Sequence, residues 1–150
     1  MLLPDDLTRR GFSLQKVSPL DFSSFFEVVK TCYTSYVNEF YGGWTEETQL
    51  RLNAKRFSEL LQNSCFQKIL LHGQIVGFFA FNEDENCICD LSVQILPAAQ
   101  NQGMGSFLLG TVTALADRTG KPARLKVFKT NPAQNLCKRL GFTVTGETPS

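Results

Sequence analysis

Residues 87–119 join an alternating strand pattern to a helix pattern through a turn that contains two glycines. In the stretch CICDLSVQIL, apolar and polar residues alternate, Leu96 breaks the alternation, and Pro97 ends it, which indicates a strand terminus or a bulge. After Gly103 the apolar residues recur at helical spacing as far as Gly120, as a capped helix requires. A further strand pattern, ARLKVF, follows. Two strands joined by one helix form a crossover unit, so we expect them to be parallel in an α/β sheet.

The remaining segments predict further strands and helices on the faces of that sheet. FSLQKV is typical of a first strand, and FQKILL and QIVGFFAF, separated by His72 and Gly73, predict an antiparallel hairpin. A long helix is expected after Ser18 and Pro19, ending at Gly42. Thr45 should cap a second helix, with a buried stripe of Leu50, Ala54, Phe57 and Leu61. Asn131 and Pro132 should open a short helix that ends at Gly141, and FTVTG is a final strand pattern.

Composition restricts the classes of protein that fit. A chain of 150 residues with 43% hydrophobic and 19% charged residues suits one globular domain, over residues 1–150. A net charge of +1, with no basic run, argues against a nucleic-acid partner. No apolar run approaches the ~20 residues of a membrane helix, and the first residues lack the apolar core of a signal peptide. Five cysteines in no secreted-type framework favour free thiols, so we expect a cytoplasmic protein.

The sequence gives little indication of a metal site. Cys87 and Cys89 form a lone C-x-C, with no second pair and no nearby histidine to complete a zinc set. Residues two apart in a strand point the same way, so we interpret both thiols as small buried hydrophobes and expect no metal. The single histidine, His72, is interpreted as a turn residue and not as a catalytic base.

The glycine turn itself, QNQGMGSFLLG at residues 100–110, indicates an anion site. Backbone N–H groups at a helix start lack partners, glycines let a ligand approach them, and the helix dipole favours negative charge. The dinucleotide fingerprint fails because Leu108 stands at its third glycine. A P-loop fails because Pro122 follows Gly120 and Lys121, and Leu115 stands at its first glycine.

The pattern Gln100-x-x-Gly103-x-Gly105 resembles the R/Q-x-x-G-x-G/A signature of the GNAT superfamily of N-acetyltransferases. The stretch NPAQNLCKRLGF at residues 131–142 resembles the later family stretch N-x-x-A-x-x-L-Y-x-x-x-G-F. The order of elements also agrees from about residue 12 onward, and QILP, GKPARLKV and LGFTVTGET look like an uncharacterised bacterial branch. The resemblance implies a mixed α/β fold, with a mostly antiparallel twisted sheet, a central parallel splayed pair and flanking helices.

By the same resemblance the co-substrate is acetyl-CoA. Its pyrophosphate would lie on the turn and the helix start, in contact with Gln100, Asn101, Gln102, Gly103, Met104, Gly105 and Ser106. Its pantetheine would pair with the backbone near Ile95 and Leu96 like an added strand. Asn131 looks like the family asparagine that contacts the pantetheine arm. In the alternative, the two glycines serve the turn alone and Asn131 only caps a helix.

The expected reaction is direct acetyl transfer to a primary amine. The N–H of Ile95 or Leu96 would face the thioester oxygen. Many relatives carry a tyrosine as the acid where this chain has Cys137, one residue closer to Asn131 than in the common pattern. A thiol donates a proton only weakly, so Cys137 is either that acid or part of the core. Glu39 is the candidate base, with Asp90 as a further candidate, and Tyr36, Tyr41 and Trp44 are candidate walls of the acceptor pocket.

The acceptor would be a small-molecule amine or a protein N-terminus or lysine. Relatives continue into one more strand after FTVTGET, whereas this chain stops at Ser150. Either that strand is absent or another chain or segment supplies it, and an unpaired sheet edge favours a homodimer. Two other functions stay open. One is a degenerate CoA-binding sensor or regulatory module, which Cys137 in place of the family tyrosine suggests. The other is a non-CoA nucleotide-binding protein.

Overall fold

The computed structural model describes residues 3–40, 43, 45–125 and 143–144, with the backbone alone at 33–40, 90, 124–125 and 143–144. Six strands form one sheet in the order β1-β2-β3-β4-β5-β6. Their bounds are β1 Phe12–Lys16, β2 Cys65–Leu71, β3 Gln74–Glu83, β4 Ile88–Ile95, β5 Ala123–Leu125 and β6 Thr143–Val144. The first four strands pair antiparallel, and β5 pairs parallel with both β4 and β6. The expected mixed sheet with a parallel crossover pair is therefore confirmed.

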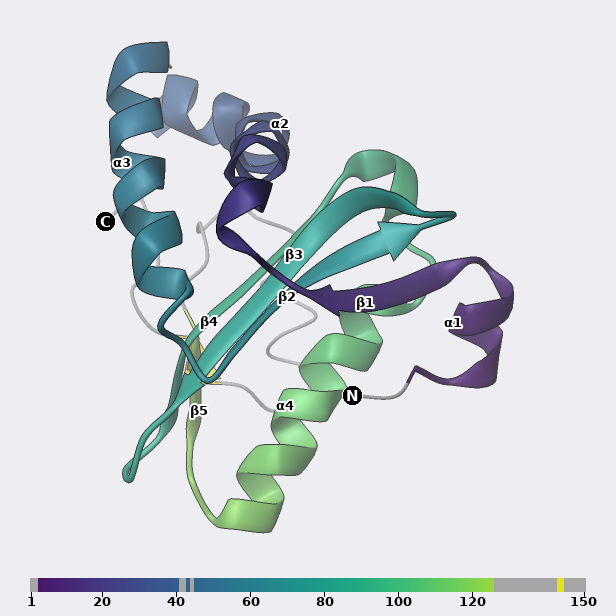
Figure 1. Cartoon of the computed structure of the whole chain (residues 1–150). Coiled ribbons are helices and arrows are strands. Elements are labelled where there is room, and N and C mark those ends of the chain that lie inside the picture. Colours follow the sequence, from purple (N-terminus) through teal and green to yellow (C-terminus); the bar gives the residue numbers. More distant parts are fainter. Residues whose placement is uncertain (1–2, 41–42, 44, 126–142, 145–150) are drawn as a thin grey trace.

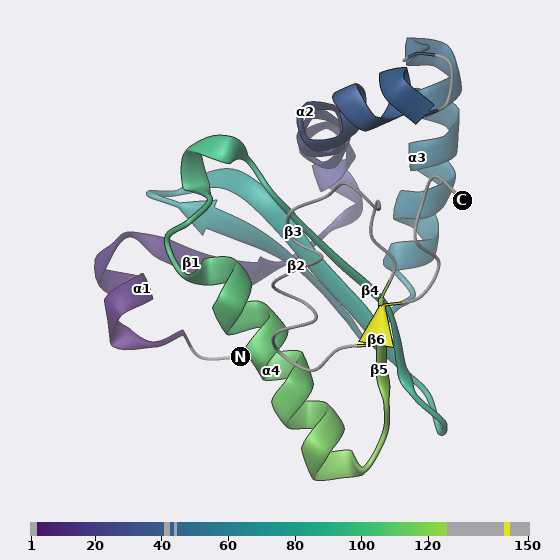
Figure 2. The ribbon, with the colours of Figure 1, turned by 180° about the vertical axis from the view of Figure 1, so that it is seen from behind.

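The helices lie on both faces of this sheet (Figure 1). Their bounds are α1 Asp5–Arg9, α2 Phe22–Phe40, α3 Glu46–Leu60 and α4 Met104–Thr119, with short 3-10 helices η1 Pro19–Asp21 and η2 Pro97–Ala99. The helices α2 and α3 cover one face and α4 covers the other, as the view from behind shows (Figure 2). Helix α1 was not predicted from the sequence, and its Leu7 is buried on the α4 side of the sheet.

Strand β3 separates two hydrophobic clusters because successive side chains of a strand point to opposite faces. Phe79 and Phe81 join Leu108 and Val112 of α4 in one cluster. Phe78 joins residues of α2 and α3 in the other cluster, where its ring lies 5.3 Å from that of Phe25. The β4 positions Leu91, Val93 and Ile95 pack on the α4 side, as their alternation predicts. Both faces of the sheet are thus buried around β3 and β4.

The hairpin turn at His72 and Gly73 is confirmed. Both residues have positive φ, 51° and 80°, which is the backbone of a tight two-residue hairpin turn. His72 also donates its N–H to Gly11 over 2.9 Å. Its place is therefore structural, at the edge formed by β1 and the β2–β3 turn.

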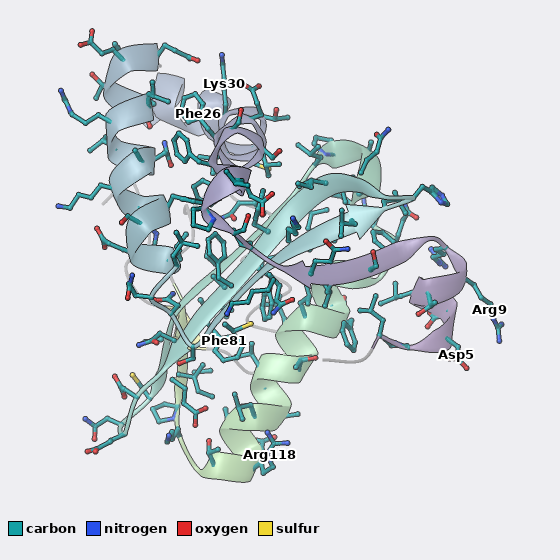
Figure 3. All side chains as sticks on the ribbon, viewed as in Figure 1. Asp5, Arg9, Phe26, Lys30, Phe81 and Arg118 are labelled. Atoms are coloured by element: carbon teal, nitrogen blue, oxygen red, sulfur yellow. The ribbon has the colours of Figure 1, made fainter. Side chains whose placement is uncertain are left out.

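The stripe expected on the second helix is wrong in its first half. Phe57 is buried, but Leu50 is 44% exposed and Ala54 is also exposed. The first turns of α3 project beyond the sheet beside α2 (Figure 1), so no strand lies beneath them. There the two helices are joined by an ion pair of 3.1 Å between Lys30 and Glu46, with Lys30 on the side of α2 away from the sheet (Figure 3).

Strand β4 ends at Ile95, as predicted, but its bulge lies elsewhere. The pairing of β3 with β4 shifts between Ala80 and Asn82, whose partners on β4 are Ser92 and Cys89. One extra β4 residue is therefore accommodated at this place and not at Leu96.

The predicted helix after Asn131 lies outside the described residues. None of the described helices combines the length and the apolar composition of a membrane-spanning segment.

Candidate active site at the end of strand β4

The site is built where β4 ends and α4 begins. After Ile95 the chain makes the short helix η2 and then a tight turn whose Asn101 and Gly103 have positive φ, 61° and 94°. Gly103 is the N-cap of α4, and only glycine adopts this backbone without strain. Left-handed residues in a turn direct successive N–H groups toward a common point, which is a known way to build an anion-binding hollow.

The N–H groups at the start of α4 have no partner in the described chain. The first helical hydrogen bond runs from Phe107 N–H to the carbonyl of Gly103 over 3.0 Å. The N–H groups of Met104, Gly105 and Ser106 therefore precede the first helical acceptor, and no described residue outside the helix accepts a hydrogen bond from them. With the positive end of the helix dipole behind them, these N–H groups can hold an anion.

The space around Gly105 indicates whether a ligand fits at the start of α4. A Cβ built on Gly105 would come no closer than 3.7 Å to another part of the described chain, at Ile95 Cδ1. Nothing in the described packing therefore requires glycine, although glycine within a helix costs about 1 kcal/mol relative to alanine. Gly105 is half-buried, and Ser106 beside it is exposed. The residues present thus fit a phosphate group that lies against the bare backbone.

The Met104 side chain lies on the apolar face expected for this helix. The Met104 side chain is 1% exposed and belongs to the core between α4 and the sheet. Met104 can therefore contribute to ligand binding only through its backbone N–H group. The side-chain amide of Gln102 donates to Ala98 over 3.3 Å, within the turn itself, so Gln102 likewise faces its own segment.

The end of β4 offers Ile95, but not Leu96, as a backbone donor. Leu96 N–H donates to the carbonyl of Val76 over 2.8 Å, so of the two alternative donors, Ile95 and Leu96, the second is wrong. The bond also makes Gly77 and Ile95 a pair without direct hydrogen bonds. The N–H and C=O groups of Ile95 therefore both point away from β3, toward the β5 side.

Two side chains converge on the Ile95 carbonyl. Gln100 Nε2 donates to it over 2.8 Å, and Cys32 Sγ of α2 donates over 3.6 Å. Burial raises the pKa of the Cys32 thiol to about 11. Cys32 is therefore a protonated thiol near neutral pH, and it joins α2 to the end of β4.

A groove of about 430 Å³ lies on the α2 side of the β4 end. It is lined by Ser23, Ser24, Glu27, Val28, Thr31, Gln74, Ile75 and Leu96. This groove was not predicted, because the sequence pattern placed the candidate acceptor residues at the far end of α2. Ser23, Glu27 and Thr31 follow one another at a spacing of four, and this polar stripe beside the apolar face of the helix was the available signal.

Several predicted residues cannot be compared with the structure. Tyr36 and Glu39 lie in the last turns of α2, where only the backbone is described, and the same holds for Asp90 in β4. Tyr41, Trp44, Asn131 and Cys137 lie outside the described residues. Their roles stay predictions.

Comparison with known families and structures identifies the fold. Residues 29–142 match the family described as the acetyltransferase (GNAT) family. No curated protein sequence matches the chain significantly.

Among solved structures, the PaiA N-acetyltransferase of Thermoplasma acidophilum in complex with coenzyme A is 17% identical, with a TM-score of 0.63, over 85% of this chain and 86% of that one. The ribosomal-protein-S18-alanine N-acetyltransferase of Escherichia coli is 17% identical, with a TM-score of 0.64, over 88% and 77%. A GNAT family acetyltransferase of Brucella melitensis in complex with acetyl-CoA is 18% identical, with a TM-score of 0.54, over 89% and 84%. At these identities the likeness shows a shared fold.

Proposed function

Since the chain belongs to the acetyltransferase (GNAT) family, we propose that it transfers the acetyl group of acetyl-CoA to a primary amine by direct attack. Family membership makes the chain an acyltransferase. The choice of donor is supported by two structural neighbours, which were solved with coenzyme A and with acetyl-CoA. The choice of an amine is supported by neighbours whose names state an N-acetyltransferase activity on a ribosomal protein alanine or on an aminoglycoside.

The observation that carries this proposal is the bare start of α4. The N–H groups of Met104, Gly105 and Ser106 lack acceptors in the described chain, and Gly105 leaves the space that a Cβ would fill. A pyrophosphate carries the negative charge that such a helix start favours. In the proposal the backbone from Asn101 to Ser106 holds it, and the pantetheine arm follows the open side of β4 at Ile95, with Asn131 beside it.

The chain's own groups then have distinct tasks. Acetyl-CoA supplies a thioester with an electrophilic carbonyl carbon and a thiolate leaving group. The N–H of Ile95 is on the β5 side of β4 and would donate to the oxygen on which negative charge develops. Cys137 is the proposed proton donor to the leaving sulfur, and Glu39 is the proposed base that takes the amine proton.

The groove beside α2 is the proposed acceptor site. Glu27 gives it a negative charge, Ser23 and Thr31 give it hydroxyls, and Ile75 and Leu96 give it an apolar wall. A carboxylate at the rim attracts a cationic ammonium before it loses its proton. The groove therefore suits a small-molecule amine, a protein N-terminus or a lysine carried on a partly apolar chain. Tyr36, Tyr41 and Trp44 stay candidate walls of the acceptor pocket.

Two measurements on the purified full chain test the proposal. Calorimetric titration with acetyl-CoA, CoA, ATP and NAD is expected to show tight binding of the first two only. Release of free thiol from acetyl-CoA is then followed with a panel of amines, and the acetylated product is identified by mass spectrometry. Turnover with at least one amine class is expected.

Two results would overturn the proposal. Preference for ATP or NAD over CoA would reject the donor site. Binding of acetyl-CoA without turnover of any amine would favour the second candidate, a CoA-binding sensor. Cys137 in place of the family tyrosine is the observation that supports this candidate.

A further inference from the structure

The turn between β3 and β4 places two thiols around one carboxylate. Asp84 begins the turn, and its Oδ1 accepts the N–H groups of Asn86 over 2.7 Å and of Cys87 over 2.8 Å. Asp84 N–H in turn donates to the carbonyl of Cys87 over 3.0 Å. One carboxylate oxygen is therefore fixed by two backbone donors, which orient the other oxygen.

That other oxygen, Asp84 Oδ2, faces both cysteines of the C-x-C pair. Cys87 Sγ and Cys89 Sγ each lie 3.9 Å from it. The three ligand atoms all lie within 4.8 Å of one another. Tetrahedral zinc with Zn–S bonds of about 2.3 Å needs sulfur atoms about 3.8 Å apart and sulfur–oxygen separations of about 3.5 Å. Side-chain rotations that move the sulfur and oxygen atoms by less than about 1 Å would bring them to these separations.

We propose that Asp84, Cys87 and Cys89 bind one zinc ion. On binding, each thiol loses its proton to solvent, two Zn–S bonds and one Zn–O bond form, and a water molecule completes the tetrahedron. The two backbone N–H groups on Asp84 Oδ1 act as the outer support that orients a metal ligand. Three anionic ligands leave the site with one net negative charge, and Lys121 lies beside it, paired with Glu83 at 2.9 Å.

The proposed zinc site is separate from the acyl-transfer site. Cys89 and Ile95 stand six residues apart on β4, which at about 3.3 Å per residue is a distance on the order of 20 Å. The turn also lies next to the start of β5, since Ile88 N–H donates to Pro122 over 2.9 Å. Zinc would therefore fasten the β3–β4 turn to β4, near the start of the parallel pair. Asp84 was not among the predicted ligands, because a C-x-C pair without a further cysteine or histidine does not indicate a zinc site in the sequence.

Zinc binding to the reduced full chain provides the test. Titration with Zn²⁺ against a chromophoric zinc chelator is expected to give one zinc per chain. Co²⁺ in place of zinc is expected to give a thiolate-to-cobalt charge-transfer absorption. Cys87→Ser and Cys89→Ser should each weaken binding at least about tenfold. Asp84→Asn keeps the acceptor for the two backbone N–H groups but loses the anionic oxygen, so it should weaken binding by a similar factor. Cys65→Ser, on β2, is the matched control and should bind as the wild type does.

A second readout uses the unaltered chain, so it does not depend on the folding of a variant. Zinc should slow iodoacetamide alkylation of Cys87 and Cys89, located by peptide mass spectrometry, and leave that of Cys65 unchanged. Three results would overturn the proposal: no stoichiometric zinc on the reduced chain, zinc binding that persists in the Cys87→Ser/Cys89→Ser double variant, or equal protection of Cys65.

Discussion

The side-chain amide of Gln100 donates a hydrogen bond of 2.8 Å to the carbonyl oxygen of Ile95. This bond joins the turn before α4 to the last residue of β4. It links the two parts of the proposed acetyl-CoA site, since the turn is proposed to hold the pyrophosphate and the end of β4 is proposed to lie along the pantetheine arm. The side chain of Gln100, the first residue of the Gln100-x-x-Gly103-x-Gly105 motif, thus has a structural role in addition to the role proposed for the motif's backbone.

Replacement of Gln100 should weaken acetyl-CoA binding without unfolding the protein. Gln100→Ala removes one hydrogen bond, worth about 1 kcal/mol, so the KM for acetyl-CoA should rise about fivefold. Gln100→Glu should be worse, because its carboxylate repels both the Ile95 carbonyl and the pyrophosphate. Steady-state kinetics and thermal unfolding measure the two effects. An unchanged KM in both variants would show that this bond does not position the site.

Gly105→Ala separates ligand binding from stability. Since a Cβ at Gly105 meets only ordinary contact at 3.7 Å, alanine should keep the fold and add up to about 1 kcal/mol of helix stability. It should nevertheless weaken CoA binding at least about tenfold, or about 1.4 kcal/mol, because the methyl group occupies the place of the phosphate.

Gly110→Ala is the matched control for this substitution. Gly110 lies in the middle of α4, and a Cβ there would meet nothing within 4 Å. Gly110→Ala should give the same gain in stability and leave CoA affinity unchanged. Calorimetry and denaturant unfolding of the two variants decide the matter, and equal CoA affinity in both would reject a phosphate at Gly105.

The fold could be predicted further than the site, for a physical reason. The hairpin at His72 and Gly73 and the helix after Gly103 depend on local backbone preferences and on periodicity, which the sequence carries directly. The place of the β4 bulge and the use of Leu96 N–H depend on β3, whose register is set by packing on both faces. The exposure of Leu50 depends on how far α3 extends past the sheet, and no local pattern encodes that distance.

Cys32 should react slowly with alkylating agents. Burial raises the pKa of its thiol from the ordinary value of 9.0 to about 11, so near pH 8 its thiolate is about 100-fold rarer than in an unfolded chain. Because the folded pKa is the higher one, the free energy of unfolding should fall as the pH rises from 9 to 11. Peptide mass spectrometry after timed alkylation, with the urea-unfolded chain as reference, measures the rate. Alkylation of Cys32 in the folded protein at the unfolded rate would contradict this.

The Asp21–Lys68 ion pair should stabilise the fold above acidic pH. The two groups lie 3.0 Å apart, with side chains 13% and 16% exposed. Burial opposes ionisation of Asp21, but hydrogen bonds from Ser18 and Lys68 outweigh it and lower the pKa below 3.8. The stabilisation is therefore present above that value and lost as the pH falls below it. Asp21→Asn should cost about 2 kcal/mol at pH 7.

Urea unfolding at pH 7 and at pH 3 measures this loss, and the difference between wild type and Asp21→Asn should shrink at the lower pH. Asp117→Asn, an exposed change on α4, should alter stability by less than about 0.5 kcal/mol. A constant difference for Asp21→Asn at both pH values would mean that its charge is not the cause.

The candidate site was only partly open to sequence reasoning. The motif at residues 100–105 identified the helix start because the chemistry there belongs to the backbone and needs only glycines in the correct order. The acceptor groove joins α2, the start of β3 and Leu96, which are far apart in sequence, and so it emerged only with the fold. The same holds for Asp84 and its two cysteines, whose meeting depends on the shape of one turn.

Backbone amide NMR during titration with CoA tests the central claim most directly. If N–H groups at the start of α4 hold the pyrophosphate, the amide resonances of residues 102–106 should shift strongly with CoA and stay in place with pantetheine, which lacks the phosphates. Saturating binding of CoA that leaves these amides unshifted would contradict the account.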